Sequence, residues 1–152
     1  MLADAWAIFA TQDGATGRVS MLTSILPRVL LVEDDSPVFV VIASVLEAHH
    51  IQVDRADTDL AAIGLVIGEK YGVIIVDVKL VHGVGLTVLK HLHDHLPHLL
   101  PSLVVVTPDD SEKVRVELQA IGICDVIPKP VEPQVILRVV QHCLDLNAST
   151  VN

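Results

Sequence analysis

Aromatic residues and cysteines are scarce in this 152-residue chain. Phenylalanine, tryptophan and tyrosine make up 3% of it, whereas aliphatic side chains bring the hydrophobic share to 51%. An aliphatic core is typical of a doubly wound α/β sheet. The two cysteines, Cys124 and Cys143, lie far apart and form no CxxC pair. Their spacing argues against a disulfide framework or a cysteine metal site, and favours buried, reduced thiols in a reducing compartment.

Basic residues and long apolar runs are also lacking. Ten lysines and arginines against nineteen acids give a net charge of −9, which argues against direct nucleic-acid binding because such binding depends on a basic surface. No apolar run is long enough to cross a bilayer. The apolar start of the chain carries Asp4 where a signal peptide has basic residues. We therefore expect a cytoplasmic protein, without membrane insertion, that meets protein partners, a cation or both.

The first 26 residues differ from the rest of the chain. Residues 3–10 have the composition of a short helix, and residues 12–17 are rich in types that form linkers and turns. Met21 opens a stretch that leads directly into the first strand pattern. We expect three segments, an N-terminal extension over 1–26, one folded domain over 27–147 and a polar tail over 148–152.

From Arg28 onward, strand and helix patterns alternate. Short apolar runs predict strands at 29–32, 51–56, 71–76, 103–106 and 123–127. Helical spacing and capping signals predict helices at 36–49, 59–68, 86–96, 109–121 and 132–146. The helix signals include Ser36 as an N-cap before Pro37, and Thr58 as the next N-cap. This alternation predicts a five-stranded parallel sheet with right-handed crossovers.

Polar side chains follow four of the predicted strands. They are Glu33, Asp34, Asp35, Asp77, Thr107 and Lys129. Because the carboxyl ends of parallel strands meet at one edge of a sheet, we expect these groups to converge. Crowded carboxylates repel each other, and Mg²⁺ compensates them while taking water or phosphate oxygens as its other ligands. A carboxylate nucleophile, a metal, a lysine and a hydroxyl are the groups that phosphoryl transfer uses.

The order and spacing of these motifs resemble the receiver domain of two-component response regulators, in a stand-alone, CheY-like form. The motifs are Val32–Asp35, Val76–Asp77, Val106–Thr107 and Gly122–Pro130. The resemblance covers about residues 28–146, nearly all of the predicted domain. It implies a flavodoxin-like, doubly wound α/β fold with a five-stranded parallel sheet in the strand order 2-1-3-4-5.

The resemblance also implies a role for each site residue. Asp77 matches the phosphoacceptor, Thr107 the hydroxyl that reads the phosphoryl group, and Lys129 the lysine that contacts it. A cis peptide bond is implied between Lys129 and Pro130. The implied Mg²⁺ ligands are Glu33, Asp34, Asp77 and the backbone carbonyl of Lys79.

The function implied is a phospho-accepting switch in a two-component system or phosphorelay, rather than an enzyme. A phosphohistidine on a histidine kinase or a phosphotransfer protein would donate to Asp77. The phosphorylated state would then act on a downstream protein or a homodimer contact. The expected contact face is built from the fourth helix, the fifth strand and the fifth helix (109–121, 123–127 and 132–146).

Three departures from the family pattern leave alternatives open. Val81 replaces a common proline, Pro108 follows Thr107 where a small residue is usual, and Val126 replaces a common aromatic switch residue. The missing aromatic and Pro108 favour a degenerate receiver that binds proteins without phosphorylation, whereas the complete set of acids, threonine and lysine disfavours it. A Mg²⁺-dependent phosphatase with an aspartate nucleophile is a further alternative. Such enzymes carry a second acid two residues after the first, and that position is Lys79 here.

Overall fold

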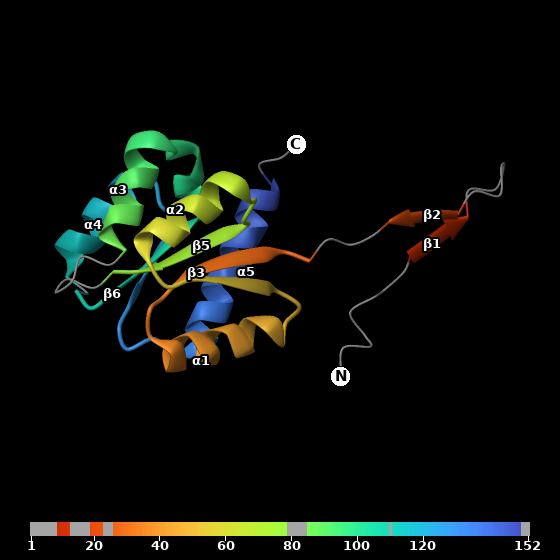
Figure 1. Cartoon of the computed structure of the whole chain (residues 1–152), viewed down its shortest axis with the longest axis horizontal. Coiled ribbons are helices and arrows are strands. Elements are labelled where there is room, and N and C mark those ends of the chain that lie inside the picture. Colours follow the sequence, from red (N-terminus) through yellow and green to blue (C-terminus); the bar gives the residue numbers. More distant parts are fainter. Residues whose placement is uncertain (1–8, 13–18, 23–25, 79–84, 110, 150–152) are drawn as a thin grey trace.

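A parallel β-sheet organises the folded part of the chain. The computed structural model describes residues 9–12, 19–22, 26–78, 85–109 and 111–149. The sheet has the spatial order β4 (Gln52–Ala56), β3 (Arg28–Val32), β5 (Val73–Asp77), β6 (Leu103–Thr107) and β7 (Asp125–Pro128). Counted from β3, this is the order 2-1-3-4-5, which confirms the predicted flavodoxin-like fold (Figure 1).

Helices connect the strands at the predicted places; the second of them has the predicted bounds, 59–68, and each of the other four predicted helices is shifted at one or both ends. They are α1 (Ser36–Glu47), α2 (Asp59–Gly68), α3 (Leu86–His95), the 3₁₀ helix η1 (Pro97–Ser102), α4 (Glu112–Ala120) and α5 (Pro133–Ser149). Thr58 caps α2 as predicted, whereas Asp35 rather than Ser36 caps α1. Ser111 caps α4, so that helix begins later than expected. Among the described helices, none combines the length and apolar character needed to traverse a bilayer.

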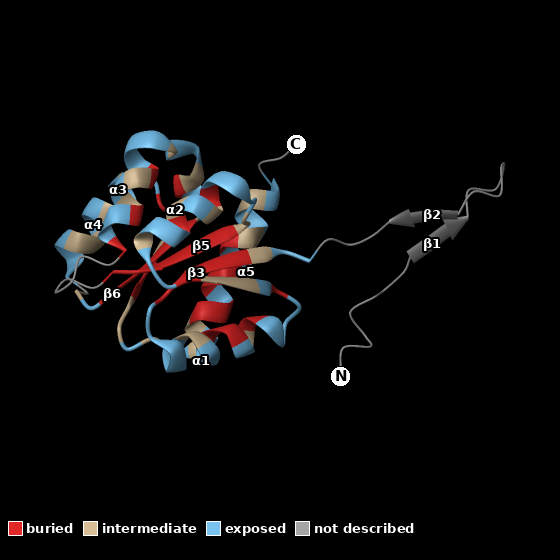
Figure 2. Cartoon of the chain, viewed as in Figure 1, coloured by how far each residue is buried: buried red, intermediate tan, exposed pale blue. Residues whose placement is uncertain are grey.

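Alternation along the strands divides the core into two layers. Val29 and Leu31 of β3 belong to the cluster that includes α1 and α5, whereas Leu30 and Val32 belong to the cluster that includes α2 and α3. Every residue of β5 and β6 is buried, as expected for central strands covered on both faces. Figure 2 shows the buried centre of the sheet between exposed outer helix surfaces.

The N-terminal residues contain a hairpin that the sequence did not indicate. β1 (Phe9–Gln12) and β2 (Val19–Leu22) pair in antiparallel fashion, with Phe9 opposite Leu22. The expected helix over 3–10 is therefore wrong for its last two residues, and its other residues lie outside the described part of the chain. The linker expected over 12–17 likewise begins with a strand residue.

The two cysteines are bonded to each other, so the expectation of reduced thiols is wrong. Cys124 lies half-buried just before β7, and Cys143 is fully buried on α5. Their α-carbons are 6.2 Å apart, within the range that a disulfide bridges. Their separation of 19 residues in the sequence does not predict the bond, because packing of α5 against the sheet brings the two cysteines together.

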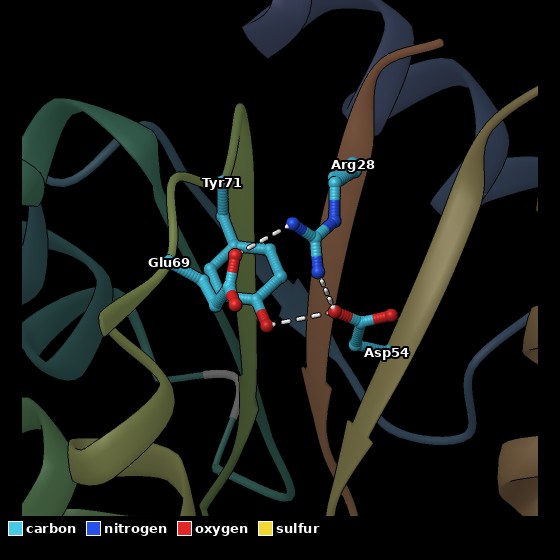
Figure 3. Close-up of polar contacts among 4 residues, drawn as sticks. All are labelled: Arg28, Asp54, Glu69 and Tyr71. Carbon is cyan, nitrogen blue, oxygen red and sulfur yellow. Dashed lines mark hydrogen bonds and ion pairs between the residues drawn. The ribbon is translucent and has the colours of Figure 1, made fainter. Parts of the chain in front are cut away.

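A polar network joins the amino ends of β3 and β5 (Figure 3). Nη2 of Arg28 lies 2.5 Å from Oδ2 of Asp54, and Nη1 lies 2.9 Å from Oε2 of Glu69. The Tyr71 hydroxyl donates to the same Asp54 oxygen at 2.8 Å, and the Tyr71 ring centre lies 5.2 Å from the guanidinium carbon. Burial, reinforced by the Asp54 carboxylate, raises the pKa of Tyr71 to about 12.

Candidate functional site

Asp77 is the last residue of β5, the central strand of the sheet. The ladder to β6 continues past it, since the amide of Val78 donates to the carbonyl of Val106 at 2.8 Å. Only 4% of Asp77 is exposed. Burying a charge this far from water is costly unless an opposite charge lies close to it. The predicted position at the carboxyl edge is therefore also one where a nearby cation lowers this cost.

Lys129 supplies that positive charge from the end of β7. Its Nζ lies 2.5 Å from Oδ1 of Asp77. The two groups form an ion pair. The Asp77 Oδ1 atom accepts no hydrogen bond of suitable geometry from the described residues. The amide of Lys129 donates to the carbonyl of Thr107 at 2.9 Å, which fixes this backbone beside β6. The peptide bond between Lys129 and Pro130 is cis, as the resemblance implied.

The acidic loop after β3 contributes three residues with different surroundings. Glu33 is buried, with 2% exposed, and its Oε1 accepts from the amide of Asp35 at 2.9 Å. Asp34 is exposed. Asp35 accepts from the amide of Val38 at 3.1 Å and so caps α1. The loop thus places one acid inside the site and one at its rim.

Arg55 holds this loop in place, and sequence reasoning missed it. From β4, its Nε donates to the carbonyl of Glu33 at 3.1 Å and its Nη2 donates to the carbonyl of Asp34 at 3.0 Å. The guanidinium carbon lies 5.0 Å from the centre of the Phe39 ring on α1. An arginine one residue before the end of an edge strand was the only sequence signal, and it does not specify a partner.

Strand alternation explains which groups share a pocket. Glu33, Asp77 and Lys129 each follow by two residues a member of the α1–α5 core cluster, namely Leu31, Ile75 and Ile127. All three therefore line one pocket of about 420 Å³. Its remaining lining is apolar and comes largely from α1 and the start of the β7–α5 connection, as Pro37, Val38, Val41, Ile42, Pro130 and Val131.

Thr107 reaches the same sheet edge on the opposite face. It follows Val105, a member of the other core cluster, by two residues, and it lines a separate pocket of about 190 Å³ beside α3 and α4. Its Oγ1 accepts from the amide of Asp109 at 3.1 Å. The Ser111 amide, and then its hydroxyl, lower the pKa of Asp109. The structure thus places Thr107 beside the other site residues along the backbone but not inside their pocket.

Gly85 and Asp59 fix the start of α3 against the site, and neither was identified from the sequence as a site residue. Gly85 has a φ of 86° and caps α3, and its amide donates to Oδ1 of Asp59 at 2.7 Å. A β-carbon at Gly85 would lie 2.8 Å from Cγ1 of Val76. In the sequence, a glycine directly before a helix permits such a close approach. The sequence does not show that Gly85 lies against the end of β5, because that contact depends on the fold.

The carboxylates at this edge of the sheet are compatible with the implied Mg²⁺. Glu33 and Asp77 are buried carboxylates that line one pocket. Within the described residues, no group of three or more histidine, cysteine, aspartate or glutamate side chains is arranged to hold a metal. Mg²⁺ commonly uses one or two carboxylates and fills its other positions with water and phosphate oxygens. The residues therefore fit an ion of this kind better than an ion that needs a complete protein cage.

Two predicted positions lie outside the described residues, and two departures lie within them. Lys79, with its implied carbonyl ligand, and Val81 fall in the segment 79–84, which the structure does not describe. Val126 is buried in the cluster that includes α2 and α3, and its carbonyl accepts from Nη1 of Arg115 at 3.4 Å. Pro108 separates Thr107 from Asp109 and contributes no amide hydrogen to that turn.

Comparisons with known proteins agree with this geometry. A receiver domain protein, described as CheY-like, from Methanospirillum hungatei JF-1 is 26% identical, covers 82% of this chain and 98% of its own, and has a TM-score of 0.70. A signal receiver domain from Vibrio parahaemolyticus is 25% identical, covers 82% of this chain and 95% of its own, and has a TM-score of 0.72. Comparison with curated protein sequences gives no match. Because the family described as response regulator receiver domain matches residues 29–141, the chain belongs to that family of two-component signalling domains.

Proposed function

We propose that this receiver is a switch that takes a phosphoryl group from a phosphohistidine onto Asp77. One observation supports the proposal above all. A buried carboxylate at the carboxyl end of the central strand lies 2.5 Å from the Lys129 ammonium and shares its pocket with Glu33. The carboxylate is a nucleophile, and the lysine is a fixed positive charge for phosphoryl oxygens.

Each group has a defined part in the proposed transfer. A carboxylate oxygen of Asp77 attacks phosphorus, the P–O bond forms as the P–N bond to the donor imidazole breaks, and the imidazole leaves. Lys129 moves its contact from Oδ1 to a phosphoryl oxygen, while Thr107 must turn from the Asp109 amide to reach the same group. Receiver domains generally bind Mg²⁺ at this position, where the ion neutralises charge on the transferring oxygens. Glu33, Asp34 and Asp77 are its proposed ligands, together with the carbonyl of Lys79.

The surface beside the pocket supports a protein donor. Val38 and Val41 on α1 are 38% and 52% exposed, and both line the pocket that holds Asp77. Exposed aliphatic side chains at the mouth of a site commonly mark a protein contact. We propose a histidine kinase or a phosphotransfer protein as the donor, and a cytoplasmic location for the exchange. The proposed output contact, to a downstream protein or a second copy, uses the face of α4, β7 and α5.

Phosphorylation by a small donor tests the proposal directly. The full chain is incubated with Mg²⁺ and either acetyl phosphate or phosphoramidate, whose P–N bond stands for that of phosphohistidine, and its intact mass is measured. We expect a gain of one phosphoryl group per chain, and its loss in Asp77→Asn. Asp57→Asn removes an exposed carboxylate just beyond β4 at the same sheet edge, so it should still gain the group.

The buried Val126 favours one alternative, a degenerate receiver that binds proteins without phosphorylation. A receiver without an aromatic residue at this position lacks the side chain that commonly couples the phosphorylation site to the output face. In a degenerate receiver, the wild-type chain would gain no mass with either donor, and this result would contradict the switch. The phosphatase alternative predicts repeated release of phosphate from small phosphate esters. A switch instead takes up one phosphoryl group on Asp77, loses it only through its own autodephosphorylation, and turns over no ester.

A further inference from the structure

We propose that Cys124 and Cys143 form a reversible thiol–disulfide site that fixes α5 to the beginning of β7. The site is separate from the phosphoacceptor pocket, since Cys124 precedes the amino end of β7 while Lys129 follows its carboxyl end. The proposal concerns the oxidation state of the two sulfur atoms and does not require Asp77 to be phosphorylated.

The surroundings of the two sulfur atoms differ. Cys143 has no exposed surface and lies in the core cluster of α1 and α5. Cys124 is half-buried against that cluster, and its amide donates to the carbonyl of Leu103 at 2.8 Å. Cys124 is therefore fixed to the sheet by its backbone, while its side chain is the one nearer to solvent. Exchange with a small thiol or disulfide should begin at Cys124.

The bond closes a segment that includes part of the proposed output face and the site lysine. Residues 125–142 lie between the cysteines and contain all of β7, Lys129 and the first ten residues of α5. Oxidation restricts how far α5 can move relative to β7. It also limits the conformations open to the segment that contains Lys129, because both ends of that segment are then joined. Reduction leaves α5 held by apolar contacts, such as those of Ile136 and Val140 in the same cluster as Ile127, and by two hydrogen bonds that the Asn147 amide donates to the Gly72 carbonyl and the Ser102 hydroxyl.

The size of the core argues for a bond that can open without unfolding the domain. Small secreted domains need disulfides because their cores are small. Here, two aliphatic clusters cover both faces of the sheet, and among the residues whose side chains are described only Cys143 and the partly buried Cys124 contribute sulfur to them. A disulfide that keeps one sulfur within reach of solvent, on a core that is otherwise complete, can be reduced and reformed without unfolding the domain.

A low-molecular-weight disulfide is the proposed oxidant of the two cysteines. The Cys124 thiolate attacks one sulfur of oxidised glutathione, which forms a mixed disulfide and releases one glutathione thiolate. The Cys143 thiol then loses its proton and attacks the Cys124 sulfur, which forms the intramolecular bond and releases the second glutathione. Two protein thiols are oxidised by two electrons, and one oxidised glutathione becomes two reduced molecules. Reduction follows the reverse path.

The test equilibrates the full chain in glutathione buffers that run from fully reduced to mostly oxidised, then counts free thiols by alkylation and intact mass. We expect the count to pass from two to zero within this range. The melting temperature should be higher in the oxidised form by roughly 10 °C, given the length of the closed segment. Hydrogen exchange of residues 125–142 should be slower in the oxidised form.

A single-cysteine chain provides the matched control. Cys124→Ala removes the half-buried partner and leaves the core residue Cys143 in place, so its melting temperature should not depend on the glutathione ratio. Two free thiols at every ratio, or none even in fully reduced buffer, would overturn the reversible site. Equal hydrogen exchange of residues 125–142 in both states would overturn the restriction of α5. These readouts concern wild-type protein, so they remain decisive if the variant fails to fold.

Discussion

A β-carbon placed on Gly85 would lie 2.5 Å from the carbonyl oxygen of Asp77. No side chain larger than hydrogen fits between the start of α3 and the end of β5 at this point, and the φ of 86° adds a second reason for glycine. The start of α3 and the backbone of Asp77 are therefore in direct contact. A change at Gly85 must move one of them.

Gly85→Ala is expected to lower the free energy of unfolding by about 3 kcal/mol, from backbone strain and overpacking together. Denaturant unfolding of the two proteins measures the difference. Gly64→Ala is the control, because a β-carbon at this exposed position within α2 meets nothing within 4 Å. That variant should be more stable than wild type by about 0.5–1 kcal/mol. Equal stability of the two variants would show that Gly85 is not packed as described.

Arg55→Gln should loosen the loop of Glu33 and Asp34, since it removes the two hydrogen bonds to their carbonyls. We expect a loss of about 1–2 kcal/mol in stability, and weaker Mg²⁺ binding in a calorimetric titration of the full chain. Phe39→Leu retains apolar packing but removes the ring under the guanidinium, so it should cost less, about 0.5–1 kcal/mol. Unchanged Mg²⁺ affinity in Arg55→Gln would show that the loop holds its shape without the arginine.

Tyr71 makes stability depend on pH in the alkaline range. The pKa of its phenol is raised to about 12 in the folded chain, against 10.0 for the free side chain. A group whose pKa is raised by folding stabilises the protein fully below the unfolded pKa, and this contribution is lost as the pH rises through the folded pKa. The Tyr71 contribution should therefore decline between about pH 10 and pH 12.

Tyr71→Phe isolates this effect, because other alkaline groups titrate in both proteins. The variant should be less stable near neutral pH by about 1 kcal/mol, the usual net value of a hydrogen bond such as that to Asp54. The difference between the two proteins should shrink as the pH rises from 10 to 12 in chemical denaturation. A difference that grows over this interval would reverse the sign expected here.

Deletion of residues 1–20 should leave the melting temperature within about 2 °C of wild type. Among the residues whose side chains are described, the two core clusters begin at Val29. A two-stranded hairpin contributes little stability on its own, and we propose that the folded domain begins near Pro27. Thermal unfolding of the shortened chain measures this, and a loss of many degrees would place the hairpin within the folded unit.

Local signals predicted much of this fold because they act over a few residues. A run of β-branched residues identified β5, and Thr58 fixed the first residue of α2. Two adjacent residues that can both cap a helix were harder to distinguish, as with Asp35 and Ser36 at the start of α1. The short helix η1 was missed, because Pro97 and Pro101 obscure helical spacing while still permitting a 3₁₀ turn.

Contacts between distant elements could not be predicted in the same way. The pairing of Cys124 with Cys143 and the reach of Arg55 to the loop after β3 depend on how α5 and β4 pack. The sequence did indicate that Glu33, Asp77, Thr107 and Lys129 would gather at one edge. It did not indicate that Thr107 would lie on the other face of the sheet. That prediction requires knowing which residues of each strand point toward which helical layer.

The two-layered core has a consequence for how chains of this kind can change length. A single residue inserted between Val73 and Ile74 would turn Ile74, Ile75 and Val76 each toward the opposite layer, and it would turn the Asp77 carboxylate away from Lys129. Both the packing and the chemistry would fail in one step. Insertions and deletions should therefore be tolerated only in the connections outside the strands.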